Sequence, residues 1–211
     1  MTTIDLLPYA ESHTTPPDAL RMRIEEFTRA EVASPQMMSG RVEAELLAAF
    51  VHATRAQSVL EVGTFTGFGT LAMAEALAPG GRIVTCELDP ERIALARRHF
   101  DESPVGDRID LREGPALTTI ESLEGPFDVA WIDADKGGYV DYWDAIVPRL
   151  SAHGVLLADN TIWRGEVLKP EGDDARAIAR FNDHALADPR MRVALLPFAD
   201  GVTVAWRQAD A

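Results

Sequence analysis

The sequence predicts an α/β fold of the Rossmann-like, doubly wound kind, with a mostly parallel sheet and a C-terminal antiparallel hairpin. Three observations support this fold class. Short apolar runs alternate with helical patterns along the chain. The runs "FDVAWIDAD" and "GVLLADN" are almost continuously apolar, as in parallel strands buried on both faces. Two β-rich runs near the end are joined by a short Asp200-Gly201 turn, which favours a hairpin.

The N-terminal part of the chain predicts an appended helix rather than a separate domain. The Pro-rich stretch "HTTPPD" breaks the chain, and "ALRMRIEEFTRAEVA" after it has helical spacing that ends before Ser34-Pro35. We therefore expect an accessory segment with a helix over residues 1–36 and one main domain over residues 37–211.

Helices and strands alternate from Glu43 onward. A helical period in "EAELLAAFVHATRA" is followed by the strand "SVLEV" and by a helix from Gly69 to "PGG". "RIVTCELD" is the next strand, and Asp89 is placed to cap the helix "PERIALARRHF", with Pro90 at its first position. "RIDLREG", "FDVAWIDAD" and "GVLLADN" are the third to fifth strands, and "MRVALLPFADGVTVAWR" forms the hairpin. In such a sheet, ligands bind beyond the carboxyl ends of the strands.

The composition is that of an acidic globular protein. The 211 residues are enough for one well-buried domain, and 34 acidic against 20 basic residues give a net charge of -14, which disfavours nucleic acid and anionic membranes as partners. No apolar run approaches the ~20 residues of a transmembrane helix and no cationic leader is visible, so we expect a cytoplasmic protein. The single Cys86 excludes an internal disulfide, and the five histidines lack the HExxH spacing of a zinc site.

Three glycines, Gly63, Gly67 and Gly69, follow the first strand in "LEVGTFTGFGTLAMAEAL". Glycine allows a sharp backbone turn and the close approach of a ligand. The spacing GxxxGxG, however, is neither the GxGxxG dinucleotide fingerprint nor a phosphate loop ending in GK[ST]. Taken alone, it favours an ordinary strand-to-helix turn.

Two glutamates indicate which ligand the turn holds. Glu87 ends the second strand, where a carboxylate can accept both hydroxyl hydrogens of a ribose, although a solvated strand-end acid would look the same. Glu61 lies inside an apolar strand and needs a polar partner, which an ammonium group on the ligand would supply. A nucleoside with both a ribose diol and an amino-acid tail is S-adenosylmethionine.

Hard oxygen donors end the fourth and fifth strands. "WIDADKGGY" contributes Asp133, and "LLADNTIW" contributes Asp159 and Asn160. Such donors suit Mg²⁺, or else Mn²⁺ or Ca²⁺, although Asp and Asn are also common turn and cap residues. Lys136 follows Asp133 closely enough to act beside the same metal, although a single lysine is usually a solvated side chain.

Together these motifs resemble the small class I S-adenosylmethionine-dependent, metal-dependent O-methyltransferases, the group that contains catechol O-methyltransferase and caffeoyl-CoA O-methyltransferase. The matching stretches are "VLEVGTFTGFGTLAMA", "EGPAL", "FDVAWIDADKGGYVDYW", "GVLLADNTIWRGEV" and "ALADPRMRVALLPFADGVTVAWR", in family order. The resemblance implies Mg²⁺-dependent methyl transfer from S-adenosylmethionine to a hydroxyl of a small catechol-like phenol, ortho-dihydroxy or ortho-substituted, in a homodimeric enzyme of natural-product metabolism.

The same resemblance implies roles for individual residues. The donor would be bound by Ser39, Glu61, Gly63, Thr64, Gly69, Glu87, Ala116 and Asp133. The metal ligands would be Asp133, Asp159 and Asn160, and the catalytic residues Lys136 and Asp133. The acceptor would lie near Met37, Trp163, Arg164 and Asp200.

Some positions depart from the family pattern or allow a second interpretation. The family often has Tyr and Ser where this chain has Phe68 and Gly69, so one hydrogen bond to the donor carboxylate is expected to be missing, and backbone amides at the helix start can replace it. Met37 is equally compatible with flexible core filler, and Arg164 with an exposed ion pair. The other tryptophans are expected to be packing residues: Trp131, Trp143 and Trp206.

Other functions fit the sequence less well. A nicotinamide-dependent reductase should show GxGxxG or TGxxxGxG with a YxxxK pair, and no YxxxK occurs. A nucleic-acid methyltransferase should end its fourth strand in an Asn/Asp-Pro-Pro-aromatic clamp instead of "IDADK". The remaining alternatives are a methyltransferase for a non-catechol small molecule and a donor-binding protein without catechol activity. The sequence does not choose the acceptor, whose contacts are expected in the N-terminal segment and the loop over residues 163–173.

Overall fold

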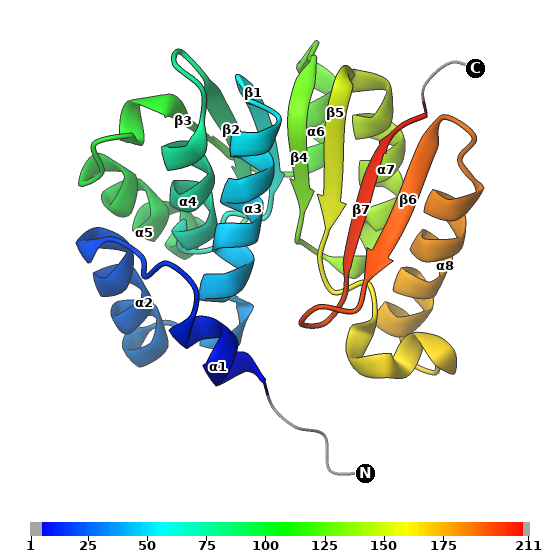
Figure 1. Ribbon diagram of the computed structural model, residues 1–211, viewed down its shortest axis with the longest axis horizontal. Coiled ribbons are helices and arrows are strands. Elements are labelled where there is room, and N and C mark those ends of the chain that lie inside the picture. The colour runs from blue at the N-terminus through cyan, green and yellow to red at the C-terminus, as the bar shows by residue number, and fades with distance from the viewer. Residues whose placement is uncertain (1–5, 209–211) are drawn as a thin grey trace.

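A single mixed sheet forms the centre of the computed structural model, which describes residues 6–208 (Figure 1). Its strands are β1 (Ser58–Val62), β2 (Arg82–Glu87), β3 (Ile109–Glu113), β4 (Phe127–Ile132), β5 (Leu150–Ala158), β6 (Met191–Leu196) and β7 (Val202–Arg207). The spatial order is β3-β2-β1-β4-β5-β7-β6, with β1 to β5 parallel and β7 antiparallel to both of its neighbours. The predicted fold class and hairpin are therefore confirmed.

Helices cover both faces of this sheet (Figure 1). On one face lie α3 (Arg41–Ala53), α4 (Phe68–Ala76) and α5 (Pro90–Asp101), and on the other α6 (Ala116–Ser122), α7 (Tyr139–Ile146) and α8 (Asp173–Ala187). The N-terminal helices are α1 (Leu7–Ser12) and α2 (Ala19–Glu31). Short 3-10 helices are η1 (Pro35–Met37), η2 (Gly106–Arg108), η3 (Lys136–Gly138), η4 (Val147–Arg149) and η5 (Trp163–Leu168).

The central strands are buried on both faces, as their continuous apolar runs predict. In β4, Ala130 and Ile132 pack toward α6 to α8, whereas Val129 and Trp131 pack toward α3 and α4. Side chains alternate between the two faces of a strand, so both faces must be apolar when helices cover both. This burial fixes the register of the strands and thereby the position of their polar carboxyl ends.

A local cap signal is confirmed, whereas the bounds of several elements differ by a few residues from the predicted runs, as for β5, which begins at Leu150 and not at Gly154. Asp89 caps α5 by accepting hydrogen bonds from the backbone N–H of Glu91 and Arg92, at 2.8 and 3.2 Å. Helix α1 was not predicted. The expectation that Trp206 is a packing residue is wrong, because 38% of the surface of this residue is exposed to solvent. Trp131 and Trp143 are buried, as expected.

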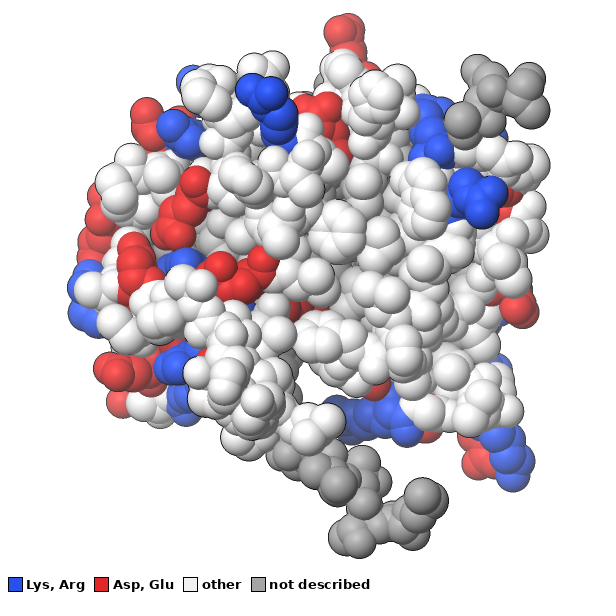
Figure 2. Space-filling view, in the orientation of Figure 1, with Lys and Arg blue, Asp and Glu red and all other residues white. Residues whose placement is uncertain are grey.

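The C-terminal half of the sheet is open on the side of α3, where no helix of residues 6–208 covers β5, β7 and β6 (Figure 1). Trp206 lies on this face opposite Val155 of β5. Figure 2 shows that the open face is mostly uncharged and that acidic side chains gather over the half formed by α2 to α5. No helix within residues 6–208 is long and apolar enough to cross a membrane.

Candidate active site

A cavity of about 990 Å³ opens at the carboxyl ends of β1, β2, β4 and β5. This is the edge at which open α/β sheets bind their ligands. The cavity is lined by every residue for which the sequence implies a role: Met37, Ser39, Glu61, Gly63, Thr64, Gly69, Glu87, Ala116, Asp133, Lys136, Asp159, Asn160, Trp163, Arg164 and Asp200. The fold thus brings all of them to one site.

Gly63 allows the turns after β1 and β4 to lie directly against each other. Its φ is +102°, and a Cβ at this position would lie 1.9 Å from the carbonyl oxygen of Asp133. The backbone N–H of Asp133 donates to the carbonyl of Val62 at 2.9 Å. Only glycine fits at position 63, because other residues rarely adopt this φ and because any side chain would clash with Asp133. Gly63 is therefore required by the contact between these two turns.

The two positions that depart from the family pattern differ in their surroundings. Phe68 is buried against α2, where the guanidinium of Arg21 lies 5.8 Å from its ring centroid. A Cβ at Gly69 would lie 3.4 Å from Ser39 Oγ and 3.8 Å from Glu61 Oε1, in ordinary contact. The hydroxyl of Ser39 therefore borders the space beside Glu61 that a side chain at position 69 would enter.

Glu61 is held by two threonine hydroxyls that the sequence analysis missed. Thr70 on α4 and Thr85 on β2 both donate to Glu61 Oε2 at 2.5 Å. Thr85 is the register partner of Glu61, so the pairing of β1 with β2 places it there. Burial raises the pKa of Glu61 to about 8, although the two hydroxyl hydrogen bonds oppose the shift. An ammonium group on a ligand is thus not the only polar partner available to Glu61.

The raised pKa of Glu61 makes the ligand-free protein less stable at high pH. The unfolded chain releases this proton near pH 4.5 and the folded protein near pH 8, so the stabilisation is complete below pH 4.5 and is lost as pH rises through 8. We expect Glu61→Gln to raise the Tm at about pH 8.5 by roughly 5 °C and to flatten its fall from about pH 5. Calorimetry across this range measures both, with Glu26→Gln on the exposed face of α2 as control. A wild-type pH slope in the Gln variant would contradict the prediction.

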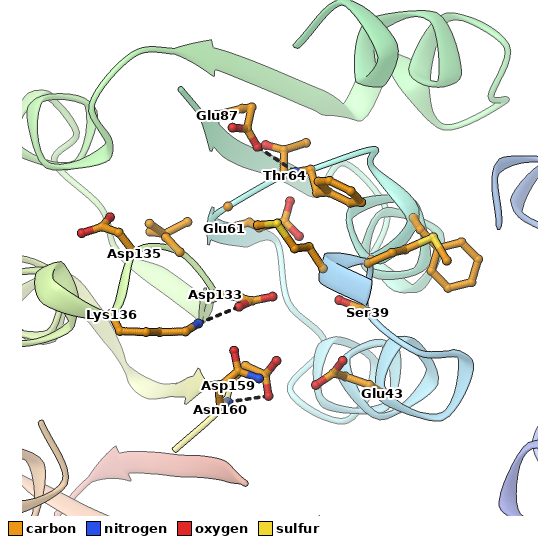
Figure 3. A pocket seen from close by; sticks show the side chains of 18 of the residues that line it. Ser39, Glu43, Glu61, Thr64, Glu87, Asp133, Asp135, Lys136, Asp159 and Asn160 are labelled. Carbon is orange, nitrogen blue, oxygen red and sulfur yellow. Dashed lines mark hydrogen bonds and ion pairs between the residues drawn. The ribbon is translucent and has the colours of Figure 1, made fainter. Parts of the chain in front are cut away.

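Glu87 is fixed by three backbone donors. The N–H groups of Phe65, Leu88 and Asp89 donate to its carboxylate at 2.8, 2.9 and 3.0 Å. The side chain is buried and points toward the cavity from the end of β2 (Figure 3). It is therefore not the solvated strand-end acid that the sequence left as an alternative.

Lys136 is aimed by Tyr139, a residue that the sequence analysis did not single out. Lys136 Nζ lies 3.2 Å from Asp133 Oδ1 and donates to the hydroxyl of Tyr139 at 2.7 Å. That hydroxyl in turn donates to the main-chain carbonyl of Asp159 at 3.2 Å. Burial raises the pKa of Tyr139 well above its usual value, so the phenol stays protonated. Lys136 is thus an anchored side chain rather than a solvated one, and the ring centroid of Trp163 lies 5.7 Å from Nζ.

The loop after β5 is strained and is held by the hairpin. The backbone φ values of Asn160, Trp163 and Arg164 are +55°, +47° and +53°. Residues other than glycine rarely adopt positive φ values. The backbone N–H of Arg164 donates to Asp200 Oδ1 at 2.5 Å, and that of Ile162 to the carbonyl of Asp200 at 2.8 Å. Asp200 therefore caps this loop, in addition to lining the cavity. Strained backbone of this kind is found where a function requires a particular side-chain placement.

Met37 and Asp159 differ sharply in exposure. Met37 is 47% exposed at the rim, where Arg92 Nη2 lies 3.7 Å from its sulfur, so its interpretation as core filler is wrong.

Asp159 is buried, and its Oδ1 accepts from the N–H of Asn160 at 2.6 Å. The pKa of Asp159 is raised well above its usual value by burial, then by the charges of Glu43 and Asp133.

Glu43 is a third carboxylate at this end of the cavity, and the sequence analysis missed it. It extends from α3 toward Asp159 (Figure 3) and is buried. Burial, and next the charge of Asp133, raise the pKa of Glu43 to about 7. A signal was present, because Glu43, Leu47 and Val51 recur every four residues on the buried face of this helix.

Comparisons with known proteins agree with this arrangement. The O-methyltransferase family model matches residues 12–208. A mouse protein described as catechol O-methyltransferase domain-containing protein 1 is 38% identical over 172 residues, 78% of this chain and 66% of the mouse protein, so the chain spans just under two thirds of that relative. Caffeoyl-CoA O-methyltransferase 1 of Eucalyptus globulus is 32% identical over 81% of this chain and 75% of its own length.

Among solved structures, the SAH-bound Podospora anserina methyltransferase PaMTH1 aligns with a TM-score of 0.91 and 32% identity, over 97% of this chain and 94% of that one. The family match covers most of the chain, and the likeness to PaMTH1 covers nearly all of it. The chain therefore belongs to the O-methyltransferase family, whose members transfer a methyl group from S-adenosylmethionine to an oxygen atom.

Proposed function

We propose that the protein methylates a hydroxyl of a small catechol-like phenol, ortho-dihydroxy or ortho-substituted, with a divalent cation, Mg²⁺, Mn²⁺ or Ca²⁺, bound beside the donor. The observation that carries this proposal is the meeting of Asp133, Asp159 and Lys136 in the cavity that also contains Glu61 and Glu87. The residues proposed to act on the acceptor and those proposed to bind the donor therefore line the same cavity.

The donor half of the cavity suits S-adenosylmethionine. Glu87, fixed by three N–H groups, would accept hydrogen bonds from the ribose hydroxyls. Glu61 and the Gly63-Thr64 backbone suit the methionine end, since a glycine there leaves the backbone open to the ligand. Other residues of the cavity would complete this half: Ser39, Gly69, Ala116 and Asp133.

The acidic half of the cavity suits a divalent cation held by Asp133, Asp159 and Asn160. Oxygen donors are those that hard cations prefer, and carboxylates buried together need a counter-charge. Glu43 Oε1 is buried without a hydrogen-bond partner among the described residues, which is consistent with a missing positive charge. A bound divalent cation supplies positive charge that lowers the pKa of a coordinated hydroxyl.

Lys136 is proposed to receive the proton of the acceptor hydroxyl or to stabilise the phenolate. The neutral amine would accept the proton, and the ammonium form would stabilise the phenolate; Tyr139 and Asp133 hold Nζ in place for either role. Trp163 forms one wall of the acceptor site, and the neighbouring residues Met37, Arg164 and Asp200 border it. Much of the acceleration is expected from positioning the acceptor oxygen in line with the methyl group.

The direct test is mass-spectrometric detection of methyl transfer. The protein is incubated with S-adenosylmethionine and a mixed panel of ortho-dihydroxy aromatics, in parallel with Mg²⁺ and with EDTA. We expect a methylated product only with Mg²⁺. Full activity in excess EDTA would contradict the cation dependence, and no product from any diol, while donor and metal both bind, would favour a non-catechol acceptor.

Replacing Lys136 by alanine is expected to lower kcat by roughly two to four orders of magnitude, because a positioned proton acceptor contributes about that much. The affinity for S-adenosylhomocysteine should stay within about twofold, since Lys136 does not lie at the glycine turn. Steady-state kinetics and calorimetry measure the two quantities. Lys169→Ala, which removes an exposed lysine paired with Glu171, is the control. A Lys136→Ala variant within about twofold of the parent would remove Lys136 from the mechanism.

The homodimer expected from the sequence stays a prediction. The open, mostly uncharged sheet face around the exposed Trp206 supports it, because a second copy of the chain would cover this side chain (Figure 2). The predicted cytoplasmic location and the division at residue 37 likewise stay predictions.

A further inference from the structure

We propose that Glu43 is an additional positioning residue of the cation site, which holds the divalent cation through a bridging water and so sets its affinity. This inference rests on the proposed function, because it requires a cation beside Asp133 and Asp159. It adds a helix on the opposite wall of the cavity to the residues that act on the cation.

The first argument is that Glu43 is buried without a complete set of partners. It is 8% exposed, and its Oε1 has no hydrogen-bond partner among the described residues. A buried carboxylate oxygen without a donor is unfavourable because its lost hydration is not replaced by a hydrogen bond. Such a group is retained when something absent from the bare chain satisfies it.

Within residues 6–208, two buried acids outside the cavity are paired with cations, unlike Glu43. Glu25 on α2 forms ion pairs with Arg29 and Arg41 at 2.9 and 2.7 Å. Asp188 forms an ion pair with Arg190 and accepts a hydrogen bond from Trp143 Nε1. The protein therefore does supply cationic or N–H partners where a buried acid serves only the fold.

Two further carboxylates and one ammonium group lie around Glu43. Asp133 and Asp159 face it across the cavity, and Lys136 is hydrogen-bonded to Asp133 and to Tyr139. Three carboxylates therefore share one ammonium group, and a cation bound beside them would relieve their mutual repulsion.

The contact to the cation is expected to run through water. Within residues 6–208, no group of three or more His, Cys, Asp or Glu side chains lies close enough to bind one ion together. Glu43 is therefore not a direct ligand alongside both aspartates. Mg²⁺ usually keeps several bound waters. A carboxylate that does not contact the ion directly can orient such a water and the ligands.

The test is direct measurement of Mn²⁺ binding to the full chain, by calorimetry and by the electron paramagnetic resonance of free Mn²⁺, without an acceptor. Glu43→Gln keeps the size of the side chain and removes its charge. We expect its Kd for Mn²⁺ to rise roughly 10- to 100-fold, as for other outer-shell partners of a metal. Its affinity for S-adenosylhomocysteine should stay within about twofold, and its Tm without cation should be equal or higher because repulsion with Asp133 and Asp159 is relieved.

The matched control is Glu45→Gln. It removes the same charge from the same helix two residues further on, where the side chain pairs with Arg21 at 3.1 Å instead of facing the cavity. Its Kd for Mn²⁺ should equal that of the wild type. If Glu43→Gln does not fold, Glu43→Met, which replaces the acid by an apolar side chain of similar size, carries the same test.

The outcomes separate this inference from the proposed function. Wild type that binds Mn²⁺ together with a Glu43→Gln variant that binds it within about twofold would overturn the role of Glu43 alone. Wild type that does not bind Mn²⁺ or Mg²⁺ would overturn the cation-dependent function and Glu43 with it. Parallel losses of Mn²⁺ and S-adenosylhomocysteine affinity in Glu43→Gln would show general damage and would also overturn the inference.

Discussion

Replacing Asp159 by alanine is expected to reduce methyl transfer by about three orders of magnitude or more, with donor affinity retained. Asp159 is a buried carboxylate at the end of β5, and Asp133 and Asn160 alone would leave the proposed cation weakly held. The loss of a metal's charge stabilisation corresponds to several kcal/mol in the transition state, and each 1.36 kcal/mol is tenfold in rate. Initial rates with a catechol acceptor give the activity, and calorimetry with S-adenosylhomocysteine gives the donor affinity.

A neighbouring acid of the same cavity provides the control for Asp159. Asp135 also lines the cavity, but it is exposed and accepts a hydrogen bond from the Tyr142 hydroxyl at 2.6 Å. Asp135→Ala should retain activity within about fivefold, and chelation of the wild type should reproduce the Asp159→Ala effect. Equal activity of Asp159→Ala and wild type would remove the cation from the proposal.

Replacing Gly63 by alanine is expected to destabilise the protein by more than about 4 kcal/mol or to prevent folding. The new methyl group would lie 1.9 Å from the carbonyl oxygen and 2.9 Å from the carbonyl carbon of Asp133, so two strand ends would have to separate. Destabilisation of that size is exceptional for one substitution and requires a rigid clash such as this one. Urea unfolding followed by circular dichroism measures it.

The substitution Gly114→Ala is the control that distinguishes the steric clash from the strain of the backbone conformation. The φ of Gly114 is +108°, close to that of Gly63, but a Cβ there would meet nothing within 4 Å. Gly114→Ala should therefore cost only about 1–2 kcal/mol, the penalty of the left-handed conformation. Equal destabilisation by the two substitutions would show that strain, and not contact with Asp133, makes glycine necessary at position 63.

The sequence by itself determined the order of the elements and the edge of the sheet at which the site lies. The strand "SVLEV" coincides with β1, and Asp89 caps α5 as expected, because apolar period and cap chemistry act between residues close in the chain. Parallel strands present their carboxyl ends at one edge, so Asp133 and Asp159 could be placed together from the strand pattern. The family resemblance then added roles for these residues.

Only the tertiary structure decided which side chains meet across the cavity. Glu43 comes to Asp159 from a helix more than a hundred positions away in the chain, and Thr85 reaches Glu61 through strand pairing. Asp200 holds the backbone of Arg164 because the hairpin tip lies beside the loop after β5. Such contacts depend on packing between distant segments, which periodicity and cap signals do not encode, whereas burial on both faces of the sheet fixes them in space.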